Sequence, residues 1–249
     1  MKTKVFILAA GLGTRLKPLT DTKPKAMVYL NGKPLLEHII LKMKSQGFDD
    51  FVINVHHFAN QIENFLKEKN NFNCRIQISD ERAELLDTGG ALLKAENLLS
   101  DTDQIIIHNV DIFSDINLNK LIDFKIKNNA LATLAVHKSN SSRKLLFDEN
   151  NQLCRWKNIN TGEEKIVRKY KGKLTEYAFT GIHIINTDIF NHITETGKFS
   201  IIDLYLRLAK TERIISSPVK YNYWFDLGKL ETLKKASQLI NNMQPYVKN

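Results

Sequence analysis

The chain has very few cysteines and no long apolar run. Its 249 residues include two cysteines, Cys74 and Cys154, and neither belongs to a Cys-x-x-Cys pair. A disulfide framework and a thiolate zinc site are therefore not expected, and both thiols should be reduced. No apolar segment approaches the roughly 20 residues of a bilayer-spanning helix, and the run at 5–10 is too short for a secretory signal. We expect a cytoplasmic protein without a membrane partner.

Internal repeats, low-complexity linkers and clusters of basic residues are also missing. Apolar residues make up 43% and charged residues 25% of the chain, which is ordinary for a globular protein and excludes a disordered chain or a fibre. The net charge of +9 comes from scattered lysines and arginines without interleaved aromatics. A strongly anionic small substrate accounts for such a charge as well as a nucleic acid does, and we expect no nucleic-acid partner.

Strand and helix patterns alternate through the first half of the chain. Apolar runs predict strands over 5–9, 51–55, 74–78, 104–107 and 131–136, and apolar residues at helical spacing predict helices over 35–44, 59–67, 90–99 and 118–127. Thr88 is expected to cap the helix over 90–99. This order predicts an α/β fold with a Rossmann-like, mostly parallel sheet flanked by helices on both faces.

The pattern changes after about residue 140. Two short strands, 145–148 and 153–156, flank a polar turn and predict a hairpin. A strand over 177–185, a helix over 201–209, a strand over 221–226 and a helix over 230–239 follow. We expect a smaller α+β lobe on the same sheet, so that a single domain, 1–249, consists of the halves 1–138 and 139–249.

A glycine-rich loop follows the first predicted strand. In open α/β sheets such a loop binds nucleotides, because glycines let backbone N–H groups approach phosphate oxygens. The loop at 10–16 matches neither a dinucleotide fingerprint nor a P-loop. Arg15 offers a fork of donors and Lys25 a point charge, and both suit a polyphosphate. The alternative is that these two are solvated surface charges.

Three segments together resemble the signature of the sugar-1-phosphate nucleotidyltransferases, or nucleotide-sugar pyrophosphorylases. They are residues 8–16 (LAAGLGTRL), 18–20 (PLT) and 24–27 (PKAM). The resemblance implies an enzyme that joins a nucleoside triphosphate to a sugar 1-phosphate and releases pyrophosphate. It makes Arg15 and Lys25 catalytic groups that bind and activate the phosphates. The loop would then wrap the nucleotide through Leu8, Ala9, Ala10, Gly11, Gly13 and Thr14.

The same resemblance implies Mg²⁺ as cofactor, held by two aspartates. Asp111 follows the strand over 104–107, with Val110 in place of the family's usual glycine, and Asp226 lies in the segment WFDLG. Two carboxylates suit an octahedral Mg²⁺ that keeps waters and takes phosphate oxygens. The other interpretation makes Asp111 a turn residue and Asp226 a helix cap.

Further segments fit a nucleotide site and a sugar site. Residues 86–91 resemble the family's segment that contacts base and ribose, where the amides at a helix N-terminus are free to donate. The resemblance assigns nucleotide contacts to Asp87, Thr88 and Gly89, and sugar-substrate contacts to Asn109, Thr180 and Gly181. The halves 1–138 and 139–249 then become the nucleotide-binding and sugar-binding halves. Lys165 matches a family lysine only in part, because no proline follows it, and its role stays open.

Residues 54–57 (NVHH) and 79–81 (SDE) make the chain most similar to the short N-acetylmuramate-1-phosphate uridylyltransferases. This favours UTP and N-acetylmuramate 1-phosphate as substrates, a link to cell-wall metabolism, and a stand-alone enzyme that is a monomer or a weak homodimer. His56 and His57 are adjacent at a strand end, where side chains point to opposite sides, and no third ligand follows. A structural role, or a place at the rim of the site, is favoured over a metal site.

Three other functions stay open from the sequence. The first is a cytidylyl- or guanylyltransferase that uses another acceptor, such as phosphocholine or a heptose or hexose 1-phosphate. The second is a nucleotide-binding protein without catalysis, against which the joint presence of Arg15, Lys25, Asp111 and Asp226 argues. The third is a basic nucleic-acid-binding module, which predicts an affinity that falls steeply with salt.

Overall fold

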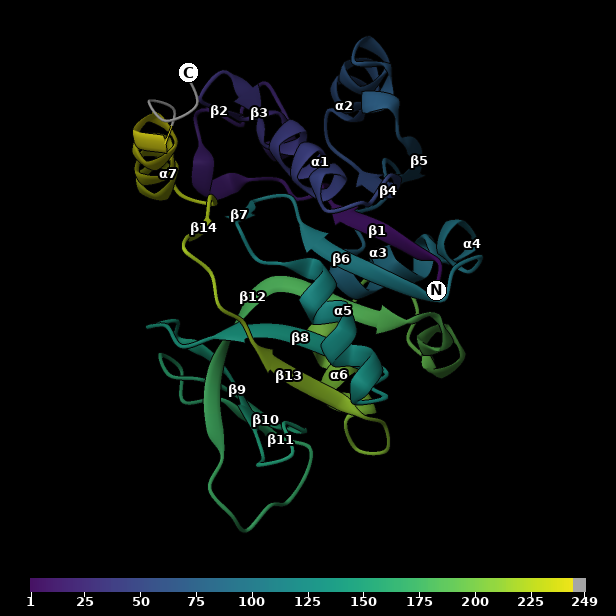
Figure 1. Cartoon of the computed structure of the whole chain (residues 1–249), viewed down its shortest axis with the longest axis vertical. Coiled ribbons are helices and arrows are strands. Elements are labelled where there is room, and N and C mark those ends of the chain that lie inside the picture. Colours follow the sequence, from purple (N-terminus) through teal and green to yellow (C-terminus); the bar gives the residue numbers. More distant parts are fainter. Residues whose placement is uncertain (244–249) are drawn as a thin grey trace.

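A ten-stranded sheet organises the chain in this computed structural model, which describes residues 1–243 (Figure 1). The predicted domain 1–249 therefore includes residues 244–249, which lie outside the described residues. The main body of the sheet has the order β5-β4-β1-β6-β12-β8-β13, and of these strands only β12 runs antiparallel to its neighbours. These strands are β1 (Thr3–Leu8), β4 (Asp50–Val55), β5 (Arg75–Asp80), β6 (Gln104–Asn109), β8 (Ala132–His137), β12 (Thr175–Asn186) and β13 (Ile214–Pro218).

The second half of the chain extends this sheet instead of building a separate one. The first residues of β12, 175–177, pair with β9 (Arg143–Phe147), while 182–186 pair with β6. Strand β9 continues antiparallel into β10 (Leu153–Asn158) and β11 (Glu164–Ile166). The α/β class, the mostly parallel sheet and the smaller lobe on the same sheet are thus confirmed. The long strand β12 is the element common to both parts.

Helices cover both faces of the sheet, which explains why its central strands are apolar on both sides. Val5 and Ile7 of β1 pack into the layer of α1 (Leu35–Ser45), α2 (Ala59–Glu68) and α5 (Leu118–Lys127). Phe6, between them, packs into the opposite layer of α3 (Asp87–Lys94), α4 (Glu96–Leu99) and α6 (Ile201–Leu208). Successive strand residues point to opposite faces, so an uninterrupted apolar run fills both cores.

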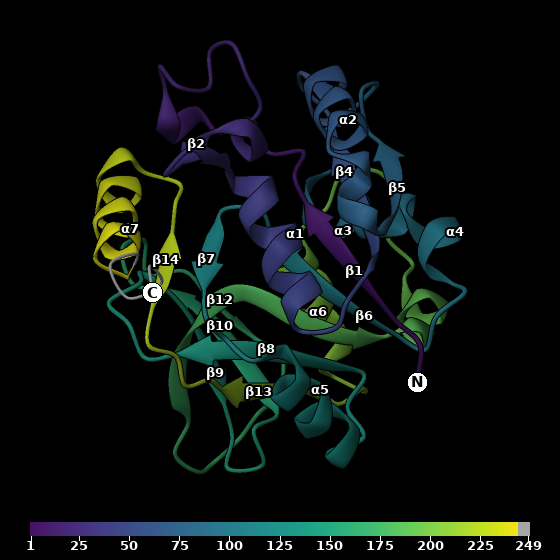
Figure 2. The same ribbon diagram turned by 45° about the horizontal axis from the view of Figure 1, so that its top comes forward.

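A third, smaller core lies beside the carboxyl end of β1. Here α7 (Leu230–Met243) packs near β2 (Tyr29–Leu30) and β14 (Trp224–Asp226), as Figure 2 shows. Strand β2 pairs with β3 (Lys33–Pro34), and β14 pairs with β7 (Ile112–Ser114) outside the main sheet. Leu16, Leu30 and Leu227 are buried together in this core. It attaches the C-terminal helix to the segment that follows the glycine loop.

Most of the predicted elements are present within one to three residues, and the exceptions are local. The predicted helix over 90–99 begins at Asp87 and is divided at Ala95 into α3 and α4. Thr88 lies inside α3, and its Oγ1 accepts the N–H of Ile201 at 3.0 Å, so its prediction as the helix cap is wrong. The strand predicted over 221–226 begins only at Trp224.

Several short elements were not predicted. They are β2, β3, β7, β11 and β13, with 3₁₀ turns at Thr14–Leu16, Lys25–Met27, Asn70–Asn73 and Thr187–His192. Two- and three-residue strands have no period that a sequence pattern could reveal, since each exists through its partner strand. Within residues 1–243, none of the helices combines the length and the apolar character needed to cross a membrane.

Candidate active site

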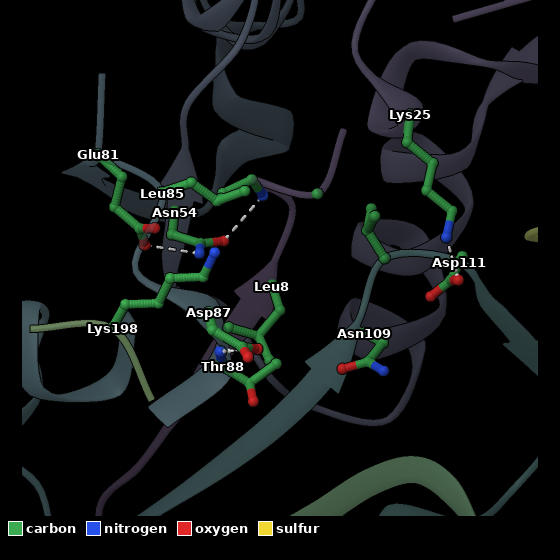
Figure 3. A pocket seen from close by; sticks show the side chains of 13 residues that line it. Leu8, Lys25, Asn54, Glu81, Leu85, Asp87, Thr88, Asn109, Asp111 and Lys198 are labelled. Carbon is green, nitrogen blue, oxygen red and sulfur yellow. Dashed lines mark hydrogen bonds and ion pairs between the residues drawn. The ribbon is translucent and has the colours of Figure 1, made fainter. Parts of the chain in front are cut away.

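The glycine loop and the Asp111 segment meet where the order of the strands in the sheet reverses. Strand β1 lies between β4 on one side and β6 on the other, and all three are parallel. At such a switch point a crevice forms beyond the carboxyl ends of the strands. A first cavity of about 360 Å³ lies there (Figure 3). Its lining includes Leu8, Ala10, Gly11, Lys25, Asn54, Glu81, Leu85, Asp87, Thr88, Asn109, Val110, Asp111 and Lys198.

Asn54 and Glu81 hold the start of the glycine loop. The backbone N–H groups of Ala9 and Ala10 donate to Asn54 Oδ1 at 2.6 and 3.2 Å. Asn54 Nδ2 in turn donates to Glu81 Oε1 at 2.7 Å, and both side chains belong to buried residues. Burial raises the pKa of the Glu81 carboxyl. In the sequence these two residues stood out only as part of the family resemblance, because their contact joins β4, the end of β5 and the loop.

Gly13 closes the loop against the segment that carries Lys25. It has a left-handed backbone with φ of 65°, and Thr20 Oγ1 donates to its carbonyl at 2.9 Å. A Cβ at this position would lie 2.9 Å from Thr20 Cγ2 and 3.1 Å from Lys25 Cβ. Glycine is therefore required both by the backbone conformation and by the close approach of the next segment.

Each predicted cation is paired with one of the predicted metal ligands. Lys25 Nζ forms an ion pair with Asp111 Oδ2, and each of these side chains is only 12% exposed. Arg15 Nη2 lies 3.9 Å from Asp226 Oδ2, with both side chains more exposed, at 56% and 41%. The two positive and two negative charges thus compensate one another.

Residues far apart in the sequence bring the two aspartates together. Asp226 is the β14 partner of Ile112, the residue after Asp111, and the N–H of Leu227 donates to the Asp111 carbonyl at 2.8 Å. Asp226 Oδ1 also accepts the N–H of Gly228 at 2.8 Å. Both carboxylates face a second cavity of about 560 Å³. This arrangement agrees with the predicted convergence of the two residues.

The second cavity adjoins the first at Asn109 and Asp111, which line both. Gly181 lies in its wall with φ of 83°, and a Cβ there would come within 2.7 Å of Ile112 Cγ1 and 3.1 Å of Asn109 Nδ2. Its other lining residues include Arg15, His137, Ser139, Asn140, Ser141, Arg143, Trp156, Phe179, Thr180, Ile202, Trp224, Asp226 and Lys229. Most of these belong to no motif, so the sequence offered no signal for them.

Thr180 has a hydrogen-bonding role in this wall. Its Oγ1 donates to the Ala135 carbonyl at 2.8 Å, and the residue is fully buried. Its own carbonyl accepts the indole N–H of Trp224 at 3.1 Å. The hydroxyl of Thr180 is thus committed to the fold, and the residue links β12 to β8 and to β14.

The N-terminus of α3 differs from the expectation of free amides. The N–H groups of Gly89 and Gly90 donate to the Phe199 carbonyl at 2.9 and 3.2 Å, so these two amides already have a protein acceptor. The N–H of Thr88 donates to Asp87 Oδ1 at 2.6 Å. Asp87 and Thr88 line the first cavity, whereas Gly89 does not. The expectation is wrong at Gly89 because a distant loop occupies that position.

The remaining candidate residues lie around these cavities. Thr14 begins a 3₁₀ turn and lines neither cavity. Lys165 pairs with Asp203 Oδ1 at 2.7 Å and lies outside both cavity linings. His56 Nδ1 lies 2.7 Å from the Glu81 carbonyl oxygen, which fits the structural role favoured from the sequence.

The arrangement is suited to holding two phosphorylated molecules with their reacting groups adjacent. Each cavity has a volume within the range of small-ligand sites. Lys25 in the first cavity and Arg15 in the second carry the positive charge that phosphate groups require. Both cavities also draw on both halves of the chain: Lys198 reaches the first cavity, and Arg15 reaches the second. The site therefore depends on how the halves fold together.

Known proteins of one chemical class are similar to this chain. A family model described as nucleotidyl transferase matches residues 4–243. The N-acetylmuramate alpha-1-phosphate uridylyltransferase of Caulobacter vibrioides is 30% identical over 84% of this chain and 85% of its own length. The enzyme of the same name from Neisseria meningitidis serogroup B is 30% identical over 95% and 97%. A structure of UDP-glucose pyrophosphorylase complexed with UDP-glucose has the same fold, with a TM-score of 0.78 and 21% identity over 98% and 100%.

Proposed function

Because the chain belongs to the nucleotidyl transferase family and is a sugar-phosphate nucleotidyltransferase, we propose that it joins UTP and N-acetylmuramate 1-phosphate. The products are UDP-N-acetylmuramate and pyrophosphate. The observation that carries this proposal is the meeting of two cavities at Asn109 and Asp111, with Lys25 and Arg15 beside the boundary. The nucleotide occupies the first cavity, and the sugar phosphate occupies the second.

The residues of the loop and its two cations bind the nucleotide phosphates. Lys25 pairs with Asp111, and its ammonium stands at the side of the first cavity where Asp111 lies (Figure 3). When a phosphate arrives, the ammonium exchanges one anionic partner for another. Arg15 is more exposed and adds a fork of donors that binds two phosphate oxygens at once. Binding therefore places positive charge where pyrophosphate develops.

The reaction is an in-line displacement at the α-phosphorus of UTP. A phosphate oxygen of the sugar 1-phosphate forms the new bond, and the bond to the bridging oxygen of the β-phosphate breaks with its electron pair leaving on pyrophosphate. The attacking oxygen is already anionic, so no general base is required. The protein must instead hold two polyanions together against their repulsion, and fixed cations in a partly desolvated site do this well.

Asp111 and Asp226 fit Mg²⁺ by the chemistry of their donors. Among the described residues, no group of three histidine, cysteine or acidic side chains could hold a metal ion. Mg²⁺ needs no such cage, since it is commonly held by one or two carboxylates with waters and substrate phosphates completing its ligands. When bound, the ion supplies charge neutralisation at the phosphates. Asp111 and Asp226 would hold the ion, and Lys25 and Arg15 would then be free to bind the phosphates.

The charge of the second cavity supports an acidic sugar. N-acetylmuramate carries a carboxylate on its lactyl ether, which N-acetylglucosamine lacks. Besides Arg15, the second cavity is lined by Arg143 and Lys229. Within residues 1–243, the Arg143 side chain has no acidic partner, so its guanidinium is available for a bidentate contact with a carboxylate. Trp156 and Trp224 add apolar surface for a sugar ring.

The test is pyrophosphate release with Mg²⁺ from each of the four nucleoside triphosphates. The acceptors are N-acetylmuramate 1-phosphate, N-acetylglucosamine 1-phosphate, glucose 1-phosphate and phosphocholine. We expect release with UTP and N-acetylmuramate 1-phosphate, loss of release in Asp111→Ala, and unchanged release in the control Asp123→Ala, which alters an exposed residue of α5. Turnover only with another pair would contradict the proposed substrates, and turnover with none would contradict the reaction.

A further inference from the structure

A lysine that no motif indicates, Lys198, lines the first cavity. It lies in the loop before α6, and its side chain points to the side of the cavity where Asn54 and Glu81 lie (Figure 3). Lys25 and Asp111 lie at the other side (Figure 3). Across the described part of the chain, Lys198 has neither an ion-pair partner nor a side-chain hydrogen bond. Its ammonium is therefore available to a ligand.

The loop that carries Lys198 is hydrogen-bonded to the N-terminal part of α3 through the residues that follow the lysine. The N–H of Phe199 donates to the Leu86 carbonyl at 3.2 Å, and the Phe199 carbonyl accepts the N–H groups of Gly89 and Gly90. The N–H of Ile201 donates to Thr88 Oγ1 at 3.0 Å. These contacts hold the backbone of the loop at the rim of the cavity.

The glycine pair of α3 makes this attachment sterically possible. A Cβ at Gly89 would overlap the Phe199 ring, and a Cβ at Gly90 would overlap the carbonyl oxygen of Gly197. Gly197 and Phe199 are the two chain neighbours of Lys198. The pair therefore lets the loop approach closely enough for Lys198 to line the cavity, which is a different role from the nucleotide contact expected for Gly89.

The chemistry around Lys198 suits the edge of a nucleobase. Leu8 and Leu85 supply apolar wall for the faces of a flat ring. Asn54 Oδ1 accepts from the glycine loop, and one of the two Nδ2 hydrogens is donated to Glu81 Oε1. An ammonium has three donors and no acceptor. The ammonium can therefore donate to a carbonyl oxygen on the ring of a base. An exocyclic amino group at the same position is itself a donor and would leave the ammonium without a partner.

We propose that Lys198 is a specificity-determining residue that donates to a carbonyl oxygen on the base. The site would then select uracil over cytosine, which has an amino group in place of the oxygen at ring position 4. This inference rests on the proposed function only in placing a nucleotide in the first cavity. A hydrogen bond that involves a charged group is worth about tenfold to a hundredfold in binding.

The test measures dissociation constants of UTP and CTP by calorimetry for the full-length protein without a sugar phosphate. We expect the wild type to prefer UTP by about tenfold or more. Lys198→Met should weaken the binding of UTP by about tenfold to a hundredfold and the binding of CTP much less, so that the preference for UTP disappears. Lys198→Arg should keep part of the preference. The matched control is Lys210→Met, which alters an exposed lysine after α6 that lines neither cavity and should change nothing.

Three outcomes would overturn the inference. They are a wild type without preference, an unchanged ratio in Lys198→Met, and an equal loss for both nucleotides, which would place the ammonium on phosphate or ribose. A urea midpoint equal to that of the wild type shows that Lys198→Met is folded. Because nucleotide binding is measured without an acceptor, it does not depend on the sugar phosphate. If no sugar phosphate supports turnover, the proposed reaction is refuted, but the comparison of UTP and CTP binding still tests the role of Lys198. Absence of binding by both UTP and CTP would refute both proposals.

Discussion

The ion pair between Lys25 and Asp111 should contribute to stability and to catalysis in ways that mutation can separate. The perturbations are Lys25→Met, Asp111→Asn and the two together. Opposite unit charges about 4 Å apart attract by about 4 kcal/mol at an effective dielectric constant of 20. Desolvation offsets much of this gain, so the pair itself adds little net stability. Removing one partner, however, leaves the other charge unpaired in a place where only 12% of its side chain is exposed.

We therefore expect each single variant to lose about 2 kcal/mol of unfolding free energy. This lies below the roughly 3–5 kcal/mol typical of fully buried pairs, because the first cavity admits water. The double variant should lose only about 1 kcal/mol, since it leaves no unpaired charge. The resulting coupling free energy is about 3 kcal/mol, at the upper end for residues in direct contact.

The assay is urea unfolding monitored by fluorescence, with pyrophosphate release measured on the same samples. All three variants should show equal slopes against urea and turnover reduced by about 10²–10³-fold. Lys25→Met loses a charge contact to the phosphates, and Asp111→Asn loses a carboxylate proposed to hold Mg²⁺. The matched control is Lys235→Met with Glu231→Gln on α7, an exposed pair that should show no measurable coupling and unchanged turnover. Additive losses in the double variant, or a double variant with wild-type turnover, would refute this reasoning.

Four further predictions concern the site and the core. Asp226→Asn should raise the Mg²⁺ concentration needed for half-maximal turnover while barely changing stability, because its side chain is 41% exposed; a metal titration checks this, and an unshifted curve would contradict it. Gly89→Ala must displace the neighbouring phenyl ring, so it should lower the urea midpoint and weaken UTP binding together, whereas loss of neither would show that the loop adapts freely. Arg143→Gln should raise KM about tenfold for N-acetylmuramate 1-phosphate and leave KM for N-acetylglucosamine 1-phosphate unchanged; equal changes in the two KM values would contradict a contact between Arg143 and the substrate carboxylate. Burial lowers the pKa values of His108 and His183 from the ordinary histidine value of 6.5 to about 3, so below pH 6.5 the unfolded chain binds more protons than the folded chain. The stability from their burial should be complete above pH 6.5 and fall by about 1.4 kcal/mol per pH unit for each histidine as the pH is lowered towards 3. Equal urea midpoints at pH 7.5 and 5.5 would contradict this.

Features that depend on neighbours in sequence were predictable. The apolar run of the first strand is buried on both faces, and the glycines after it mark a loop whatever surrounds them. The amphipathic helices α1, α2 and α5 lie within about one residue of their predicted bounds for the same reason. Arg15, Lys25 and Asp111 were found because they lie in or beside such local signals.

Features that depend on a distant partner were not predictable. Strand β13 has its place only through its pairing with β8, and β7 exists through its pairing with β14. Thr88 has the residue type of a helix cap, but the N–H of Ile201 takes its hydroxyl as acceptor. In each case a non-local contact outweighs a local preference of comparable size.

The sequence by itself thus determined the α/β class, the glycine loop and the residue types that phosphate chemistry needs. Only the tertiary structure decided which charges face each other, since Lys25 and Asp111 are 86 residues apart in the chain. It also placed Lys198 in the first cavity, through backbone contacts with a glycine pair more than 100 residues earlier in the sequence. The physical reason is that a side chain's partners depend on the packing of sheet and helices, which adjacent residues do not encode.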